Sequence, residues 1–232
     1  MPLSAASSAI HSPRIQAILF DLDGTVADTA PDLAYAANSL RLADGVPPLP
    51  VEILRPVASQ GARGLLKEAV GLTPNDPGFE HARLRFLSYY EHNLCVHTRL
   101  FPGIEALLTG IEARGLPWGI VTNKVEYYAL PLMQKLGLAN RCAVIVGGDT
   151  TPNPKPAPDP LHYAAQAINI APEACLYVGD DLRDVQAAHA AGMASVAVRW
   201  GYLGDGPPIE RWNADHIVRT PKDLHDLLET LC

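Results

Sequence analysis

The chain has 232 residues, of which 48% are apolar and 19% are charged, and its formal net charge at pH 7 is −7. This composition is typical of a folded protein that can bury a full core and still hold a second, smaller domain, and it argues against general disorder. The negative charge argues against a nucleic-acid partner, because no basic stripe is available to replace the counterions of a phosphate backbone. A small anionic ligand needs only a few local cations and is not excluded.

Four cysteines are scattered through the chain without the short spacing of a zinc or redox site. Such thiols fit a reducing compartment, so we expect a cytoplasmic protein. Residues 1–14 are small and polar with no apolar stretch, which predicts a flexible N-terminal tail and not a signal peptide. No apolar run approaches the ~20 residues of a membrane-spanning helix, so no membrane partner is expected.

Five short apolar runs rich in valine and isoleucine predict strands that are buried on both faces of a sheet. They lie at residues 15–20, 116–121, 143–146, 174–178 and 194–198. Helical patterns separate the later runs, at residues 104–114, 125–136, 159–168 and 184–191. Because strands and helices alternate, the sequence predicts an α/β fold with a doubly wound parallel sheet.

Residues 29–98 break this alternation, since they contain helical stretches but no convincing strand. The helical stretches lie at residues 32–42, 51–57, 62–70 and 80–93. We expect a small all-helical domain here, inserted after the first strand of a core that comprises residues 15–28 and 99–232. The alternative is one continuous core with an unusually long connection, which compact domains seldom tolerate.

Polar side chains follow three of the predicted strands, at the edge where an open parallel sheet binds its ligands. Asp21 and Asp23 follow the first strand, Thr122 and Asn123 the second, and Asp180 the fourth. Taken singly, each of these three segments could be an ordinary turn or a helix cap. Their occurrence together at successive strand ends favours a single site.

Carboxylates gathered in this way raise one another's pKa values unless a cation lies among them. Oxygen ligands without His or Cys indicate Mg²⁺, which bridges to phosphate groups. A carboxylate held against Mg²⁺ can attack phosphorus and form an aspartyl phosphate. Thr122 would supply a hydroxyl for the transferred oxygens. Lys155 would supply a cation from the proline-rich stretch 151–160, unless that stretch is a solvated linker. Lys124 could belong to the site or could equally be a solvated residue at the start of a helix.

These segments resemble the four motifs of the haloacid dehalogenase-like hydrolases, in the same order. Asp-Leu-Asp-Gly-Thr at residues 21–25 resembles the first motif, and Thr122 with Asn123 the second. Lys155 resembles the third motif, and Gly-Asp-Asp-Leu-Arg-Asp at residues 179–184 the fourth. The resemblance covers nearly the whole chain after residue 14 and implies a Rossmann-like core with a helical C1-type cap.

The resemblance also implies roles for the acidic residues. Asp21 would be the nucleophile and a Mg²⁺ ligand. Asp23 would act as general acid and then as general base, and its main-chain carbonyl would bind the metal. Asp180 would complete the metal ligands, with Asp184 as a minor contributor. Asp181 stands where many relatives have Ser or another small polar residue, which leaves its role open.

The family's phosphate-binding positions fall on Thr122, Asn123 and Lys155. Residues 115–124, 178–188 and 200–202 resemble bacterial phosphoglycolate phosphatases, which implies hydrolysis of 2-phosphoglycolate to glycolate and phosphate. N-acetylmuramic acid 6-phosphate phosphatases belong to the same branch and remain an alternative. In the cap, Arg63 is the candidate to bind a substrate carboxylate, unless it is a solvated surface arginine.

Three other functions stay open at this point. A sugar phosphomutase would use the same scaffold and return the phosphoryl group to a sugar. A signalling receiver domain also accepts phosphate on an aspartate, but it needs neither the helical insert nor a second carboxylate at Asp23. A catalytically inactive binding module is disfavoured, because every expected catalytic position is filled. The expected partner is a small phosphorylated metabolite; the oligomeric state stays open.

Overall fold

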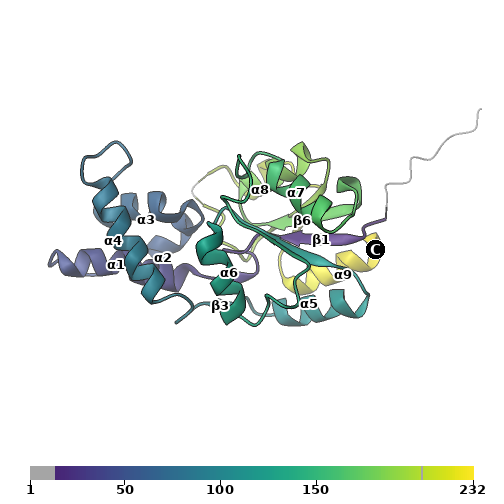
Figure 1. Cartoon of the computed structure of the whole chain (residues 1–232), viewed down its shortest axis with the longest axis horizontal. Helices are drawn as coiled ribbons and strands as arrows, with labels where there is room; N and C mark the ends of the chain where they lie inside the picture. The colour runs from purple at the N-terminus through teal and green to yellow at the C-terminus, as the bar shows by residue number, and fades with distance from the viewer. Residues whose placement is uncertain (1–13, 205) are drawn as a thin grey trace, which may run out of the picture.

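A computed structural model describes residues 14–204 and 206–232, so residues 1–13 of the expected tail lie outside the described part. Its core is a six-stranded parallel sheet with the strand order β5-β4-β1-β6-β7-β8 (Figure 1). The strands are β1 (Ala17–Phe20), β4 (Trp118–Val121), β5 (Val144–Val146), β6 (Cys175–Gly179), β7 (Ala194–Val198) and β8 (His216–Val218). The first strand, β1, lies inside the sheet, with β4 and β5 added on one side of it and β6, β7 and β8 on the other. This arrangement confirms the predicted doubly wound α/β fold.

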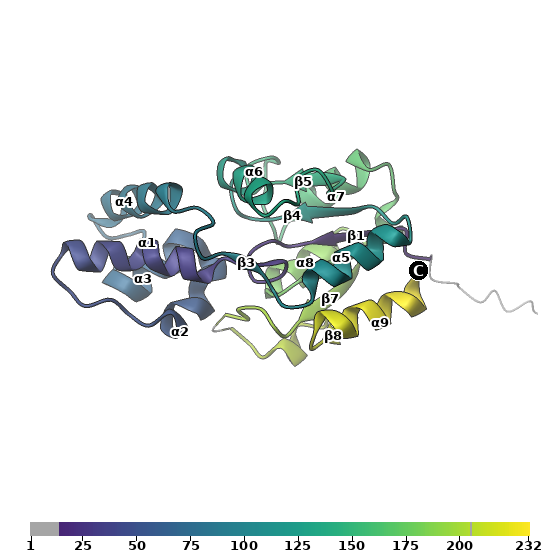
Figure 2. The ribbon, with the colours of Figure 1, turned by 90° about the horizontal axis from the view of Figure 1, so that it is seen from below.

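Helices cover both faces of this sheet (Figure 2). One face carries α5 (Ile104–Ala113), α6 (Glu126–Lys135) and α9 (Pro221–Leu231), and the other carries α7 (Asp159–Ala167) and α8 (Leu182–Ala190). Successive residues of β1 point to opposite faces, so Ile18 packs in the first layer and Leu19 in the second. This two-sided burial explains why the strands are unbroken apolar runs in the sequence.

The last strand and helix were not expected from the sequence. β8 lies at the edge of the sheet and its Ile217 is exposed, so the strand has no buried apolar run to reveal it. The start of α9 did carry a signal, because Thr220 and Asp223 form a reciprocal capping box there. Two short 3₁₀ helices, η2 (Pro172–Ala174) and η3 (Ile209–Arg211), complete the core.

The segment between the first core strand and α5 folds into a separate group of helices, on the left in Figure 1. Its elements are α1 (Ala30–Ala43), α2 (Val51–Leu54), the 3₁₀ helix η1 (Arg55–Gln60), α3 (Gly61–Val70) and α4 (Phe79–His92). The single helix expected at 51–57 is divided into α2 and η1, because Pro56 lacks the N–H that would continue the α-helical pattern. We call this group the cap. None of the described helices is long and apolar enough to cross a bilayer.

A short antiparallel pair of strands connects the cap to the core. β2 (Ala27–Asp28) and β3 (Arg99–Leu100) pair Ala27 with Leu100 and Asp28 with Arg99. Two-residue strands carry no periodicity, so neither was expected. From the core, the hydroxyl of Tyr202 accepts hydrogen bonds from the N–H groups of Thr29 (2.7 Å) and Ala30 (2.9 Å), which holds the start of α1 in place.

Candidate active site

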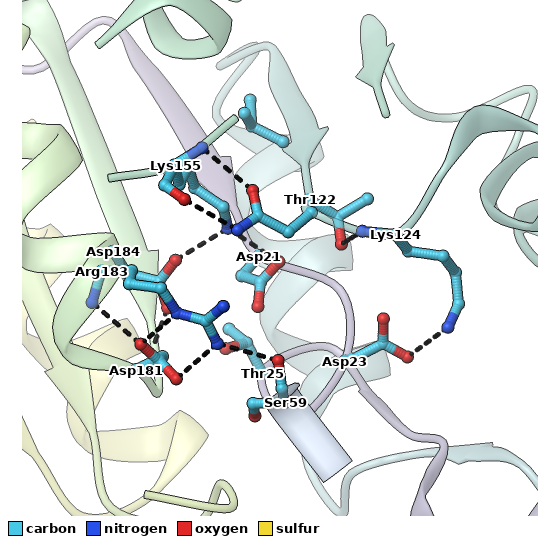
Figure 3. Close-up of polar contacts among 12 residues, drawn as sticks. Asp21, Asp23, Thr25, Ser59, Thr122, Lys124, Lys155, Asp181, Arg183 and Asp184 are labelled. Carbon is cyan, nitrogen blue, oxygen red and sulfur yellow. Dashed lines mark hydrogen bonds and ion pairs between the residues drawn. The ribbon is translucent and has the colours of Figure 1, made fainter. Parts of the chain in front are cut away.

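The residues predicted at the strand ends lie together at the edge of the sheet that faces the cap (Figure 3). Asp21 directly follows β1, Thr122 follows β4, and Asp180 follows β6. Lys155 comes from the proline-rich loop between β5 and α7. Asp21, Thr122 and Lys155 line a cavity of about 740 Å³ between core and cap, whose other wall is formed by cap residues.

Three buried carboxyl groups form an acidic cluster at the base of this site. Asp21, Asp180 and Asp184 each place a carboxylate oxygen within 4.8 Å of the others. Burial, together with the charges of Asp21 and Asp184, raises the pKa of Asp180 well above its ordinary value. Burial also raises the pKa of Asp184 to about 6, against the opposing effect of Lys155. The cluster therefore holds its full negative charge only when further cations offset it.

Two glycines make room for the carboxylate of Asp180. It accepts hydrogen bonds from the hydroxyl of Thr25 (2.8 Å) and the N–H of Tyr202 (2.7 Å). A Cβ atom at Gly24 would lie 2.2 Å from Oδ2 of Asp180, and one at Gly201 would lie 2.1 Å from its Cβ. The glycine of the Asp-Leu-Asp-Gly-Thr segment is thus required by the close approach of a carboxylate from another strand.

The donor set fits Mg²⁺. Its side-chain ligands would be Asp21, Asp180 and Asp184, all hard carboxylate oxygens, as this cation prefers. Asp184 is thus placed as closely as the other two, although the sequence suggested only a minor part for it. The carboxylate of Asp23 lies outside this cluster, and metal binding by its main-chain carbonyl stays a prediction.

Lys155 is a buried cation beside the acidic cluster, with only 4% of its surface exposed. Its Nζ lies 2.9 Å from Oδ1 of Asp21 and 2.7 Å from Oδ1 of Asp184, and it donates to the hydroxyl of Tyr177 at 2.7 Å. Burial acts to lower the pKa of Lys155, but the charges of Asp184 and Asp21 outweigh it and the pKa is raised. Lys155 is therefore a fixed positive charge at the site and not a solvated linker residue.

Asn123 holds the loop that carries Lys155. Its side-chain amide donates to the carbonyl oxygen of Lys155 (2.9 Å) and accepts from the N–H of Lys155 (3.0 Å). The amide is thus occupied by protein main chain, and direct phosphate binding by Asn123 stays a prediction. The neighbouring Thr122 is 2% exposed, and its Oγ1 accepts from the N–H of Lys124 at 3.2 Å.

Asn123→Ala is expected to lower kcat about 10- to 100-fold, the usual effect of removing a group that orients a residue of the site. Asn38 in the cap offers a matched control, because it makes the same pair of hydrogen bonds with Leu49, both 2.8 Å. Each substitution should lower the free energy of unfolding by about 1–3 kcal/mol. Phosphate-release kinetics and thermal unfolding would separate the two effects. An equal loss of kcat in Asn38→Ala would contradict this role of Asn123.

Asp23 has different surroundings from Asp21. Its Oδ1 accepts a hydrogen bond from the hydroxyl of Thr29 and lies 2.9 Å from Nζ of Lys124. That ammonium also lies 5.0 Å from the centre of the Tyr90 ring, which belongs to the cap. Burial acts to lower the pKa of Lys124, but Asp23 outweighs it and the pKa is raised. Lys124 is thus a buried partner of Asp23 and not a solvated residue.

Arg63 lies in the first turn of α3, where its exposed side chain lines the cavity from the cap side. It makes no ion pair or hydrogen bond with another residue of the described chain, so its guanidinium is available to a ligand. Arg183 lines the same cavity from the core, and sequence reasoning missed it. The apolar part of the cap wall includes Leu33, Pro74, Phe79, Phe86 and Leu87, and Tyr128 of α6 adds to the lining from the core.

The stability of the metal-free protein is expected to fall as the pH rises from about 4 through 6. The pKa of Asp184 is raised to about 6 and that of Asp180 is also raised, so in this window the folded protein binds more protons than the unfolded chain. Mg²⁺ should reverse the trend, by about 2.7 kcal/mol at a hundredfold excess over its dissociation constant. Thermal unfolding with EDTA or Mg²⁺ at several pH values tests this. A Mg²⁺ effect as large at pH 4 as at pH 7 would refute it.

Comparisons with known proteins agree with this geometry. Residues 18–198 match the family model described as haloacid dehalogenase-like hydrolase. The chain is 42% identical over 220 residues to an N-acetylmuramic acid 6-phosphate phosphatase of Pseudomonas aeruginosa, covering 94% of this chain and 97% of the relative. It is 46% identical over 211 residues to a phosphoglycolate phosphatase of Xanthomonas campestris pv. campestris, covering 90% and 94%.

A crystal structure of a predicted phosphoglycolate phosphatase from Haemophilus somnus is similar with a TM-score of 0.81 and 30% sequence identity, covering 92% of this chain and 97% of that one. The family model thus covers residues 18–198, and the relatives and the solved structure cover 90% or more of the chain. The chain belongs to the haloacid dehalogenase-like hydrolases.

Proposed function

We propose that the protein is a Mg²⁺-dependent phosphatase that hydrolyses a small phosphate monoester through an aspartyl phosphate on Asp21. The observation that carries this proposal is the position of Asp21 at the floor of the cavity. It belongs to the buried acidic cluster, and its Oδ1 lies 2.9 Å from the ammonium of Lys155. A carboxylate held there can reach a phosphate group that enters the cavity.

In the first step, a carboxylate oxygen of Asp21 forms a bond to phosphorus while the bond from phosphorus to the ester oxygen breaks. Asp23 donates a proton to the departing alkoxide. Asp23 then takes a proton from a water molecule, whose oxygen forms a bond to phosphorus while the bond from phosphorus to Asp21 breaks. This releases inorganic phosphate and restores the carboxylate of Asp21. Lys155 and the hydroxyl of Thr122 offset the charge on the transferred oxygens. Bound Mg²⁺ would lower the repulsion between the carboxylates and the phosphate.

The separate surroundings of Asp21 and Asp23 support this division of roles. Asp21 shares the acidic cluster, whereas Asp23 lines the cavity between Lys124 and the hydroxyl of Thr29. A receiver domain, which stores phosphate on its aspartate, has no use for a second acid and base at this place. The cap over the cavity also favours turnover of a bound small molecule.

The first candidate substrate is 2-phosphoglycolate, and Arg63 would bind its carboxylate. The size of the cavity favours a second candidate, N-acetylmuramic acid 6-phosphate. About 740 Å³ lies within the range that holds drug-sized ligands, which is more than a two-carbon acid needs. The apolar cap wall would suit the acetyl and methyl groups of this sugar acid, and its carboxylate is again suited to Arg63. Relatives with either name have a similar sequence identity to this chain, 42% and 46%.

The deciding experiment is phosphate release by the purified protein from 2-phosphoglycolate, N-acetylmuramic acid 6-phosphate and glucose 6-phosphate, with and without EDTA. We expect one of the two carboxylated substrates to give the highest kcat/KM, and EDTA to remove the activity. Isomerised sugar phosphate in place of free phosphate would indicate a phosphomutase. Full activity after complete chelation would reject the metal site.

Arg63→Ala is expected to raise KM about tenfold for the preferred carboxylated substrate, because a charge-assisted hydrogen bond is lost. KM for glucose 6-phosphate should stay within about twofold, since that molecule has no carboxylate for Arg63 to bind. Steady-state kinetics with both substrates measure the difference. An unchanged KM for every carboxylated substrate would exclude this role of Arg63.

The partner in this proposal is a small phosphorylated metabolite, with no nucleic acid and no membrane. We propose a cytoplasmic location, which the free thiols of the four cysteines support.

A further inference from the structure

Arg183 joins the core to the cap at the rim of the cavity (Figure 3). It belongs to the first turn of α8, and its Nη2 donates a hydrogen bond of 2.8 Å to the main-chain oxygen of Ser59. Ser59 lies in η1 of the cap, and the two residues are 124 positions apart in the sequence. A charged donor on a main-chain carbonyl is among the stronger hydrogen bonds of a protein.

Asp181 fixes the orientation of this arginine. Its Oδ1 accepts from Nε of Arg183 and its Oδ2 accepts from Nη2, both at 2.8 Å, which is the two-pronged geometry of an arginine with a carboxylate. Oδ1 also accepts from the N–H of Arg183 at 2.9 Å, so Asp181 caps α8 as well. The N–H of Asp181 in turn donates to Asp184 at 3.0 Å, which connects the pair to the acidic cluster.

On the cap side, the contact lies just before a turn that only glycine adopts readily. Gly61 has φ +61° and ψ −150°, and a Cβ atom there would meet nothing within 4 Å. The need for glycine is therefore conformational and not steric. Because α3 starts at this turn, the position of Ser59 sets the position of Arg63 in the first helical turn.

We propose that the Asp181–Arg183 pair is a positioning device for substrate recognition, which holds the cap segment 59–63 at a fixed distance from the phosphate site. This inference rests on the proposed function. The core would hold the phosphate group, and Arg63 would hold the carboxylate. Arg183 then determines the distance between these two binding points, although it acts through the cap and need not touch the substrate.

The first test needs no substrate. Arg183→Ala is expected to make amide hydrogen exchange in residues 58–66 about tenfold faster, because the charged hydrogen bond to Ser59 is lost. Arg114→Ala is the matched control, since Arg114 is 29% exposed and paired with Glu229 on the core, and Arg183 is 34% exposed. Exchange in that segment should be unchanged in the control. Unchanged exchange in Arg183→Ala would overturn the proposal.

The second test separates positioning from a general loss of structure. Arg183→Ala should raise KM about tenfold for whichever of 2-phosphoglycolate and N-acetylmuramic acid 6-phosphate is turned over faster, with a smaller change in kcat. The inhibition constant of inorganic phosphate should stay the same, because phosphate alone does not reach the cap. A weaker inhibition by phosphate would assign Arg183 to the phosphate site itself and overturn the proposal.

A double-mutant cycle with Arg63 shows whether the two arginines act together. If Arg183 acts by positioning Arg63, the double variant Arg63→Ala/Arg183→Ala should have nearly the KM of Arg183→Ala. Multiplied effects on KM would mean independent roles and overturn the proposal. Asp181→Asn keeps a residue that can cap α8 but removes the charge that orients Arg183, so its KM should rise in the same way. A wild-type KM in Asp181→Asn would also overturn the proposal.

The two proposals fail in different ways. A wild-type protein that releases phosphate from no substrate would refute the phosphatase, whereas the exchange experiment would still show whether Arg183 holds the cap segment. An active phosphatase with unchanged exchange and unchanged KM in Arg183→Ala would refute the positioning role alone.

Discussion

Asp21→Asn is expected to abolish phosphate release, with kcat lower by about 10⁴-fold or more, as when other covalent nucleophiles are removed. The amide has nearly the same shape but cannot attack phosphorus as an anion. The thermal stability of this variant should not decrease. One charge leaves the cluster of Asp21, Asp180 and Asp184, so the metal-free variant should unfold at the same temperature as the wild type or higher. Phosphate-release kinetics and thermal unfolding with EDTA measure both effects.

Asp32→Asn is the matched control, because Asp32 is also a buried aspartate but lies in α1. Its carboxylate accepts hydrogen bonds from the N–H groups of His97 (2.8 Å) and Thr98 (2.9 Å) and from the hydroxyl of Thr98 (2.7 Å). The substitution should therefore lower the free energy of unfolding by about 1–3 kcal/mol and leave kcat within a few-fold. Substantial phosphate release by Asp21→Asn would reject the covalent mechanism.

The predictable part of the fold is the part that is buried on both sides. β1, β4, β6 and β7 lie inside the sheet, whereas β5 lies at an edge but keeps its residues at least half-buried. All five are short apolar runs, and the predicted bounds agree within two residues. The site followed from the same logic, because the ends of parallel strands meet at one edge. β8 forms the other edge, and its central residue Ile217 is exposed, so it has no buried apolar run of the kind that revealed the other strands.

The residues whose surroundings the sequence could not supply are those defined by long-range contacts. Nothing near Arg183 in the chain indicates that its guanidinium meets the carbonyl of Ser59. The sequence left open whether Lys124 belongs to the site or is solvated at a helix start, and the fold places it against Asp23, 101 positions away. Asn123 looked like a phosphate ligand, but its amide is bound to the main chain of Lys155. Motifs identify such residues, and only the fold shows what they touch.

Gly201→Ala is expected to impair metal binding strongly, although it changes no charged residue. The new Cβ atom would lie 2.1 Å from Cβ of Asp180, so one of the two main chains must move. The next residue, Tyr202, donates its N–H to Oδ2 of Asp180 at 2.7 Å, and a shift of residue 201 therefore displaces the carboxylate directly. We expect kcat/KM at limiting Mg²⁺ to fall about 100-fold and the free energy of unfolding to fall by about 1–3 kcal/mol.

Gly206→Ala supplies the control for that experiment, because it adds the same methyl group five positions further along the chain, where a Cβ atom meets nothing within 4 Å. Its kinetics and stability should match the wild type. A Mg²⁺ titration of kcat/KM then separates the two effects of Gly201→Ala. A displaced metal ligand moves the midpoint to higher Mg²⁺, so part of the activity returns at saturation, whereas a misfolded site loses activity at every concentration. An unchanged midpoint together with a wild-type kcat/KM would contradict the prediction that residue 201 positions Asp180 as a metal ligand.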